Sequence, residues 1–206
     1  LSIQCNLRKI NYSDYKIYEI NDGTTVTLYY YNGSWRMSTT NGVDVTNLNW
    51  MGPTCYGDAL LAAAAKYPEF SYDKLDQKIC YTVGFRFKDF HPLVDNNQAT
   101  MWFIAAHDLT TCAAVTCNIG IPAHLPIDIK LSDNREIANY LIERNGTAIC
   151  DRLDKTNPTT HYGFILRGSG ELPSYVVEST LLKQVRTLIY NQPKTKYADQ
   201  TKIDHT

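Results

Sequence analysis

The sequence lacks a long apolar run. None of its apolar stretches approaches the roughly eighteen residues that a membrane-spanning helix needs, so we expect no membrane span. Its start, LSIQCNLRKI, lacks both an initiator methionine and the charged-then-apolar layout of a secretory signal. We therefore expect an intracellular protein, in the cytoplasm, whose first residues have been processed or trimmed.

An excess of charge of either sign is also missing. The chain has 20 basic and 21 acidic residues, which gives a net charge of -1 at pH 7. Non-specific binding to nucleic acid or to a membrane surface is usually driven by a large net positive charge. The net charge therefore gives no reason to expect either kind of binding, although it does not exclude a local basic groove.

Cysteine is present without the dense spacing of a disulfide framework. The six cysteines are scattered along the chain, which favours free thiols in a reducing compartment. The stretch from His107 through Cys112 and Cys117 to His124 holds four possible zinc ligands. Their spacings match no common zinc module, so we expect no metal site.

Several catalytic sequence frames are absent. No G-x-G-x-x-G follows a strand-like run and no G-x-x-x-x-G-K-[ST] occurs, which argues against dinucleotide-binding folds and P-loop NTPases. No G-x-S-x-G singles out a serine nucleophile, so hydrolase chemistry has little support.

What the sequence does have is enough apolar material for one core. It has 206 residues, of which 44% are hydrophobic and 12% aromatic, with 15 tyrosines. This length and composition predict a single domain over residues 1–206 with a polar tail from about residue 191. The aromatic content favours strands.

A hairpin is the strongest local prediction. TTVTLYYY (Thr24–Tyr31) is strand-like, Asn32-Gly33 is a preferred two-residue turn, and SWRMSTT follows as the partner strand. Further strands are predicted at Cys80–Phe87, Thr100–Ala106 and His161–Arg167.

Three helices are predicted among these strands. The first covers Tyr56–Tyr67 and ends before Pro68; the second covers Ser132–Arg144, with Ser132 as N-cap and Gly146 just past its end. The third covers Glu178–Tyr190, where apolar residues recur at helical spacing. Hairpin-linked strands interrupted by helices indicate an α+β fold with largely antiparallel sheets and flanking helices.

The order of these segments carries a resemblance. Asp22-Gly23 precedes a strand; a hairpin containing WRMST, a helix, an aromatic strand, FIAAHD, a helix, YGFILR and ESTLLK follow. This order resembles the adenylation domain of the RNA ligase branch of covalent nucleotidyltransferases, over roughly Tyr15 to Tyr190. The resemblance implies a cleft in which a lysine of a K-x-D-G motif attacks the α-phosphate of ATP or GTP. It also implies acidic residues that hold a metal and a K-x-K pair that contacts the phosphates.

The sequence departs from the family at each catalytic position. Ile20 stands where the K-x-D-G lysine is expected, and Arg86 stands where a strand normally carries a glutamate. Tyr162 replaces the glutamate of E-G-F, and the K-x-K motif falls on Val176 and Glu178. The resemblance therefore implies a degenerate domain of the kind found in large DNA viruses, which would act as a non-catalytic pseudoenzyme with a structural or assembly role. It also implies a location in a virion as an alternative to the cytoplasm, protein partners in an assembly, and no cofactor or metal.

Two alternatives stay open. One is an active RNA ligase or guanylyltransferase that uses Lys16 with ATP or GTP and Mg. The other is a module that binds nucleotide or RNA without covalent chemistry. For an inherited cleft, the resemblance implies nucleotide contacts from Asp22, Gly23, Trp35, Arg36, Arg86, Tyr162, Phe164 and Arg167. Each also has an ordinary interpretation as a turn, core or solvated residue.

Overall fold

The structure is a computed structural model that describes residues 7–21, 23–49, 53–87, 100–129, 132–147 and 163–178. Contacts divide the chain into two compact units. The terminal unit combines Leu1–Ile20 with Ile127–Thr206, and the central unit is Asn21–Pro126. The single domain inferred from the sequence stays a prediction, and its polar tail lies outside the described residues.

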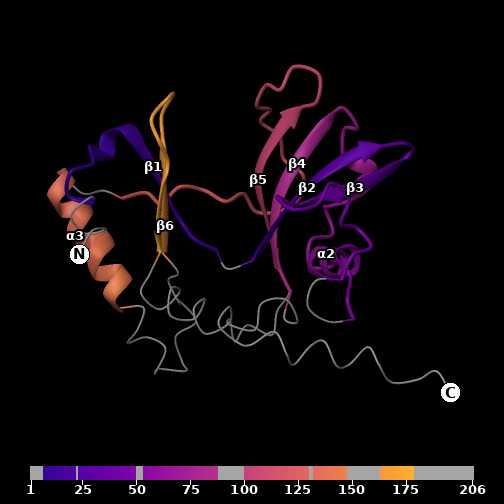
Figure 1. The fold of residues 1–206 in the computed structure, drawn as a ribbon, viewed down its shortest axis with the longest axis horizontal. Helices are drawn as coiled ribbons and strands as arrows, with labels where there is room; N and C mark the ends of the chain where they lie inside the picture. The colour runs from indigo at the N-terminus through magenta and orange to yellow at the C-terminus, as the bar shows by residue number, and fades with distance from the viewer. Residues whose placement is uncertain are drawn as a thin grey trace. The chain divides into compact units, whose positions relative to one another are not determined.

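The central unit is built on a four-stranded antiparallel sheet (Figure 1). Its strand order is β3-β2-β4-β5, with β2 at Thr24–Tyr31, β3 at Ser34–Ser38, β4 at Ile79–Arg86 and β5 at Thr100–Asp108. The predicted hairpin is confirmed. Asn32 and Gly33 have φ values of 48° and 80°, the left-handed conformation that a tight two-residue turn needs at both positions.

One face of this sheet carries the hydrophobic core of the central unit. Helix α2 (Tyr56–Ala64) buries Ala59, Leu60 and Ala63 in the same cluster as the sheet residues Val26, Leu28, Met37, Val83, Phe85 and Met101. Its length is three residues short of the prediction. The opposite face, here called the outer face of the central sheet, carries Thr25, Thr27, Arg36, Ser38, Thr82, Arg86 and Trp102 by strand alternation and register.

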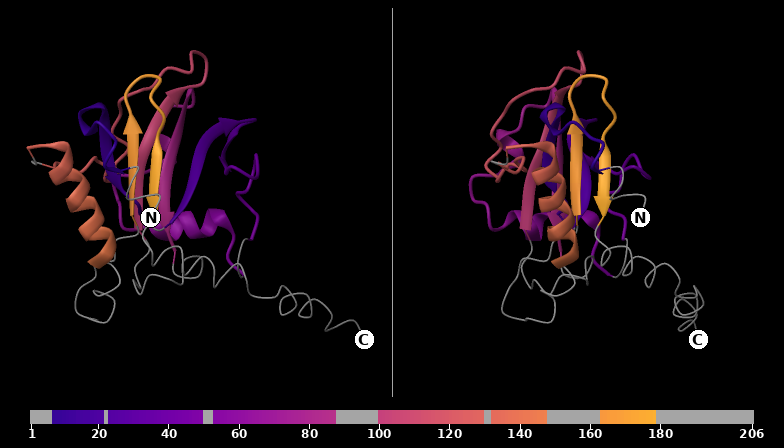
Figure 2. Two further views of the ribbon diagram at one scale, coloured as in Figure 1. Left: turned by 60° about the vertical axis from the view of Figure 1, so that its left-hand side comes forward. Right: turned by 90° about the vertical axis from the view of Figure 1, so that its left-hand side faces the viewer.

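The terminal unit contains a three-stranded antiparallel sheet of order β1-β6-β7. The strands are β1 (Tyr15–Glu19), β6 (Gly163–Gly168) and β7 (Tyr175–Glu178), and a short 3-10 helix (Tyr12–Asp14) precedes β1. Helix α3 (Asn134–Thr147) lies on one side of this sheet (Figures 1 and 2). It packs there through Ala138 and Leu141 against a core formed by Ile17, Phe164, Leu166 and Val177.

The ends of α3 differ from the prediction. Asp133, not Ser132, is the capping residue: its Oδ1 accepts the backbone N–H of Glu136 at 2.8 Å. The Glu136 carboxylate in turn accepts from the backbone N and the hydroxyl of Ser132, at 2.9 and 2.7 Å. Gly146 lies within the helix rather than past its end, because the helix continues to Thr147.

The third predicted helix is wrong at its first residue. Glu178 belongs to β7, a strand that was not predicted, because Tyr175, Val176 and Val177 pair with β6 as an aromatic and β-branched run. The rest of that predicted helix lies outside the described residues. The strand expected at His161–Arg167 is confirmed from Gly163 onward, with His161 and Tyr162 outside them.

The α+β class with antiparallel sheets is confirmed. In the described part of the chain, no helix has both the length and the apolar content to cross a bilayer.

Candidate functional site

The predicted site residues divide between the two units. Lys16, Phe164 and Arg167 belong to the terminal unit, whereas Gly23, Trp35, Arg36 and Arg86 belong to the central unit. Asp22 and Tyr162 lie outside the described residues.

Trp35 lies on the core face of the central sheet. Its ring centroid is 5.5 Å from that of Tyr30 and 6.0 Å from those of Tyr72 and Tyr81. Tyr72 and Trp35 both pack against the core of the central unit, and burial raises the pKa of Tyr72 to about 12. Trp35 therefore packs in the hydrophobic core and does not reach the outer face of the central sheet.

Phe164 is completely buried in the core of the terminal unit, with 0% of its surface exposed. A ring without accessible surface cannot receive a stacking base, so its predicted role as a base platform is replaced by a core position. Its register partner on β7 is Val177, which is buried in the same core.

Arg36 is held by an ion pair. Its Nη1 donates to Asp44 Oδ2 at 2.8 Å, and Asp44 Oδ1 accepts from the hydroxyl and backbone N of Thr46 at 2.7 and 3.1 Å. These bonds, those from Thr46 first, hold the pKa of Asp44 below its ordinary value. Arg36 thus anchors the segment that follows β3, instead of presenting an uncompensated charge.

Lys16 and Arg167 are exposed register partners on β1 and β6. The Arg167 guanidinium lies 5.1 Å from the centre of the Tyr18 ring, within the range of a cation–π contact. A nucleophilic lysine is normally helped by burial, which Lys16 does not have.

The motif positions of the terminal unit fall in one row across its sheet. The backbone N of Ile20 donates to the Gly163 carbonyl at 2.9 Å, and Gly163 is the register partner of Glu178. Val176 is two residues before Glu178, on the same face of β7, with 61% of its surface exposed. The face with Lys16 and Arg167 thus has an isoleucine, an exposed valine and a carboxylate where the resemblance requires lysines.

Trp102 is a residue of the outer face of the central sheet that sequence reasoning missed. Its indole lies over Gly84, its partner in the β4–β5 ladder, and over Gly23: a Cβ at either glycine would overlap the ring. A Cβ at Gly23 would also lie 2.7 Å from the Phe85 carbonyl oxygen. A glycine inside a strand pattern is a signal for such a close approach. Gly23 of the I-N-D-G turn therefore has a packing reason to be glycine.

Arg86 ends β4 on the same face as Trp102. Together with Asn21, Trp102 and His124 it lines a cavity of about 300 Å³ within the central unit.

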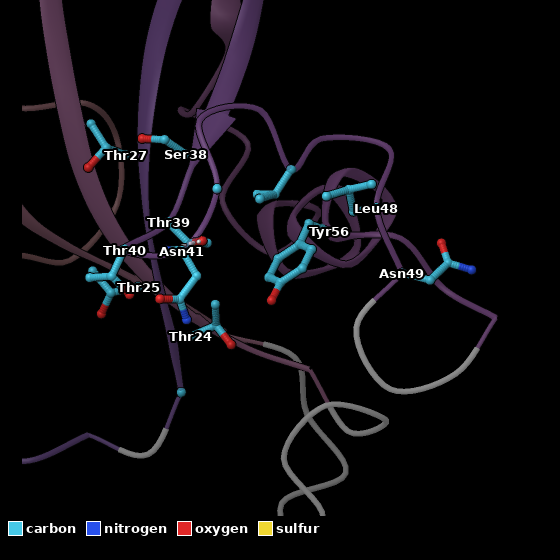
Figure 3. A pocket seen from close by; sticks show the side chains of 13 residues that line it. Thr24, Thr25, Thr27, Ser38, Thr39, Thr40, Asn41, Leu48, Asn49 and Tyr56 are labelled. Carbon is cyan, nitrogen blue, oxygen red and sulfur yellow. Dashed lines mark hydrogen bonds between the residues drawn. The ribbon is translucent and has the colours of Figure 1, made fainter. Parts of the chain in front are cut away.

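A second cavity, of about 680 Å³, adjoins Gly23 in the central unit (Figure 3). One wall is the start of β2, another is the segment after β3, and Tyr56 enters from α2. The side chains of Thr24, Asn41 and Tyr56 point toward one another across it (Figure 3). The described residues that line it are all uncharged: Gly23, Thr24, Thr25, Thr27, Ser38, Thr39, Thr40, Asn41, Gly42, Val45, Leu48, Asn49 and Tyr56.

No family model matches the chain. The chain is 26% identical over 116 residues to a protein of African swine fever virus (isolate Pig/Kenya/KEN-50/1950) named "Putative RNA-ligase". It is 27% identical over 120 residues to the protein of that name from strain Badajoz 1971 Vero-adapted. These matches cover 47% and 49% of this chain but only 26% and 27% of the relatives, so the chain spans about a quarter of their length in the aligned region.

Solved structures extend the comparison to most of the chain. An archaeal ATP-dependent RNA ligase matches with a TM-score of 0.57 at 12% identity, covering 90% of this chain and 47% of that one. A mutant Naegleria gruberi RNA ligase with ATP and Mn matches with a TM-score of 0.50 at 12% identity, covering 87% and 54%. At 12% sequence identity, these structural matches show a similar fold and nothing about function. Together with the viral sequence relatives, they support an RNA-ligase-like domain of nucleotidyltransferase fold that is similar to proteins of a large DNA virus.

Proposed function

We propose that this chain is a non-catalytic RNA-ligase-like domain with a structural or assembly role, for example in a viral particle. The observation that carries the proposal is the row formed by Ile20, Gly163 and Glu178 across the terminal sheet. Three motifs that are far apart in the sequence meet in this row. Their meeting supports the alignment from which the missing lysines were inferred.

The chemistry of the row opposes nucleotidyl transfer. An isoleucine side chain has no nitrogen to form a phosphoramide. A carboxylate at Glu178 would repel the phosphates that a lysine there would attract, since like charges at short range are unfavourable. Val176 offers no hydrogen-bond donor to stabilise developing charge.

Exposed apolar side chains support a role in contacts with protein. Leu172, Tyr175 and Val176, on and just before the edge strand β7, are 43%, 39% and 61% exposed. An edge strand with exposed aliphatic and aromatic side chains is a common place for association with another chain.

A covalent labelling assay tests the proposal. The full chain is incubated with α-labelled ATP or GTP and Mg²⁺ or Mn²⁺, and acid-stable label on the protein is measured. We expect none in the wild type and none in Lys16→Ala. Label that appears on the wild type and disappears in Lys16→Ala would establish the active ligase or guanylyltransferase instead.

One observation favours a second candidate, non-covalent binding of nucleotide or RNA. Lys16, Tyr18 and Arg167 combine two cations with an aromatic ring on one face of the terminal sheet. Such binding would weaken steeply with salt, because neutralising phosphates releases counterions. In fluorescence anisotropy with short RNA at moderate salt, we expect no saturable micromolar binding. Saturable binding abolished by Arg167→Ala, with unchanged circular dichroism, would favour the binding module.

A further inference from the structure

We propose that the cavity of about 680 Å³ beside Gly23 is a binding site for an uncharged sugar ring that carries vicinal hydroxyl groups. The site goes beyond the proposed structural role and requires no covalent chemistry. Its volume is within the usual range for small-molecule pockets, about 300–1,000 Å³.

The polar lining fits a diol. Threonine and serine hydroxyls each donate and accept hydrogen bonds, and the Asn41 amide offers a donor and an acceptor side by side. Adjacent hydroxyls of a sugar present the same alternation. Thr24 and Asn41 both line the cavity, with Tyr56 across from them, so a ring bound there would meet polar groups along one edge (Figure 3).

The apolar lining fits the carbon face of the same ring. Tyr56, Val45 and Leu48 contribute an aromatic ring and two aliphatic side chains to the cavity. A sugar has polar edges and less polar faces of C–H groups, which pack well against aromatic and aliphatic surfaces.

The wall formed by the segment after β3 is fixed before any ligand arrives. The backbone N of Val45 donates to the Met37 carbonyl at 2.8 Å, and the hydroxyl of Tyr29 donates to the Val43 carbonyl at 2.6 Å. The Arg36–Asp44 ion pair holds the same segment at 2.8 Å. A preformed wall lowers the ordering cost of binding.

The charge of the lining selects against phosphorylated ligands. Among the described residues that line this cavity, none is lysine, arginine or histidine, and Arg36, which is not among them, is paired with Asp44. A phosphate would lose hydration here without gaining a cation. Recognition therefore concerns the hydroxyl-bearing ring itself, which could come from a pentose or a hexose.

The experiment titrates the full chain with methyl β-D-ribofuranoside, methyl α-D-glucopyranoside and ribose 5-phosphate, followed by protein-observed NMR. We expect saturable shifts with at least one of the two neutral glycosides, centred on the lining residues. Ribose 5-phosphate should bind no more tightly than the ribofuranoside. The two glycosides distinguish a pentose from a hexose as the source.

Variants make the test specific. Thr25→Val keeps the shape of the side chain and removes its hydroxyl, and Asn41→Ala removes the amide. Each should weaken the affinity about threefold to tenfold, the usual effect of losing one hydrogen bond. Thr110→Val is the matched control: Thr110 is an exposed threonine of the same unit, outside this lining, and affinity should not change.

Three results would overturn the inference: no saturable binding of either glycoside, at least tenfold tighter binding of ribose 5-phosphate, or affinities unchanged in both Thr25→Val and Asn41→Ala. None of these would produce covalent label from ATP. Failure of the sugar site and failure of the proposed non-catalytic role are therefore separate outcomes.

Discussion

Replacing Gly84 with alanine should destabilise the central unit through one side chain, Trp102. The three heavy atoms nearest to an added Cβ all belong to the Trp102 indole, and all would overlap it. Trp102 is only 9% exposed and cannot move aside without losing packing. The substitution therefore isolates a single contact on the outer face of the central sheet.

Two opposing effects set the magnitude. Overpacking a filled site typically costs about 1–3 kcal/mol. Alanine also restricts the unfolded chain more than glycine does, which offsets about 0.4–1 kcal/mol where the backbone conformation is compatible. We expect Gly84→Ala to lower the free energy of unfolding by about 1–2 kcal/mol, the difference between these effects.

A double-mutant cycle with Trp102→Val tests the cause. Valine suits a strand and lacks the atoms that the new Cβ would meet, although Trp102→Val alone should cost about 2–4 kcal/mol through lost packing. In that background Gly84→Ala should be neutral or slightly stabilising, giving a coupling of about 2 kcal/mol. Urea unfolding followed by far-ultraviolet circular dichroism avoids reliance on tryptophan fluorescence. An equal cost of Gly84→Ala in both backgrounds would refute the reasoning.

Three further predictions concern the central unit. The depressed pKa of Asp44 means that its stabilising contribution is present above the unfolded-state pKa of about 4 and is lost as the pH falls through the lower folded-state pKa. In Asp44→Asn, the midpoint of urea unfolding should therefore decrease less steeply as the pH is lowered than it does in the wild type. An equally steep decrease in both proteins would contradict this. The pKa of Tyr72, raised to about 12, means that stability falls as the pH rises from about 10, the unfolded-state pKa. Tyr72→Phe should reduce this alkaline loss and remove one late-ionising tyrosine from an absorbance titration. Gly33→Ala should cost about 1–2 kcal/mol for its left-handed backbone alone, since no heavy atom lies within 4 Å of an added Cβ; no loss in thermal unfolding would count against it.

The sequence predicted best what depends on neighbouring residues. The Asn32-Gly33 hairpin follows from local turn chemistry, and the structure has it at the predicted position. Helix α2 was predicted from its run of helix formers and differs only at its end. The predicted N-cap of α3 was wrong by one residue. Ser132 and Asp133 are both good capping residues, and only the hydrogen-bond geometry of the structure distinguishes them.

Faces of strands were harder to predict, although part of the signal was present. In SWRMS, Trp35 alternates with Arg36 and shares a face with Met37, a pattern that already indicates a core position for Trp35. Phe164 shares a face with Leu166 in the same way. Trp102 gave no such signal, because the run Met101–Trp102–Phe103 is apolar at every position and period two cannot select a face. Its place became visible only through Gly84, the glycine opposite it in the ladder.

The terminal sheet shows how an RNA-ligase-like domain could lose its catalytic lysines, as proposed here, and still keep its fold. Its stability rests on the face with Ile17, Phe164 and Leu166, which packs against α3. The motif positions are on the opposite face, where Val176 is largely exposed. Substitutions at exposed positions usually change stability by no more than about 0.5 kcal/mol, whereas buried large-to-small changes cost several times more. In a domain that is non-catalytic, as proposed, lysines on that face could be replaced without unfolding the domain, whereas the core residues could not. This asymmetry is consistent with the proposed non-catalytic role, in which Ile20, Val176 and Glu178 stand where the resemblance implies lysines.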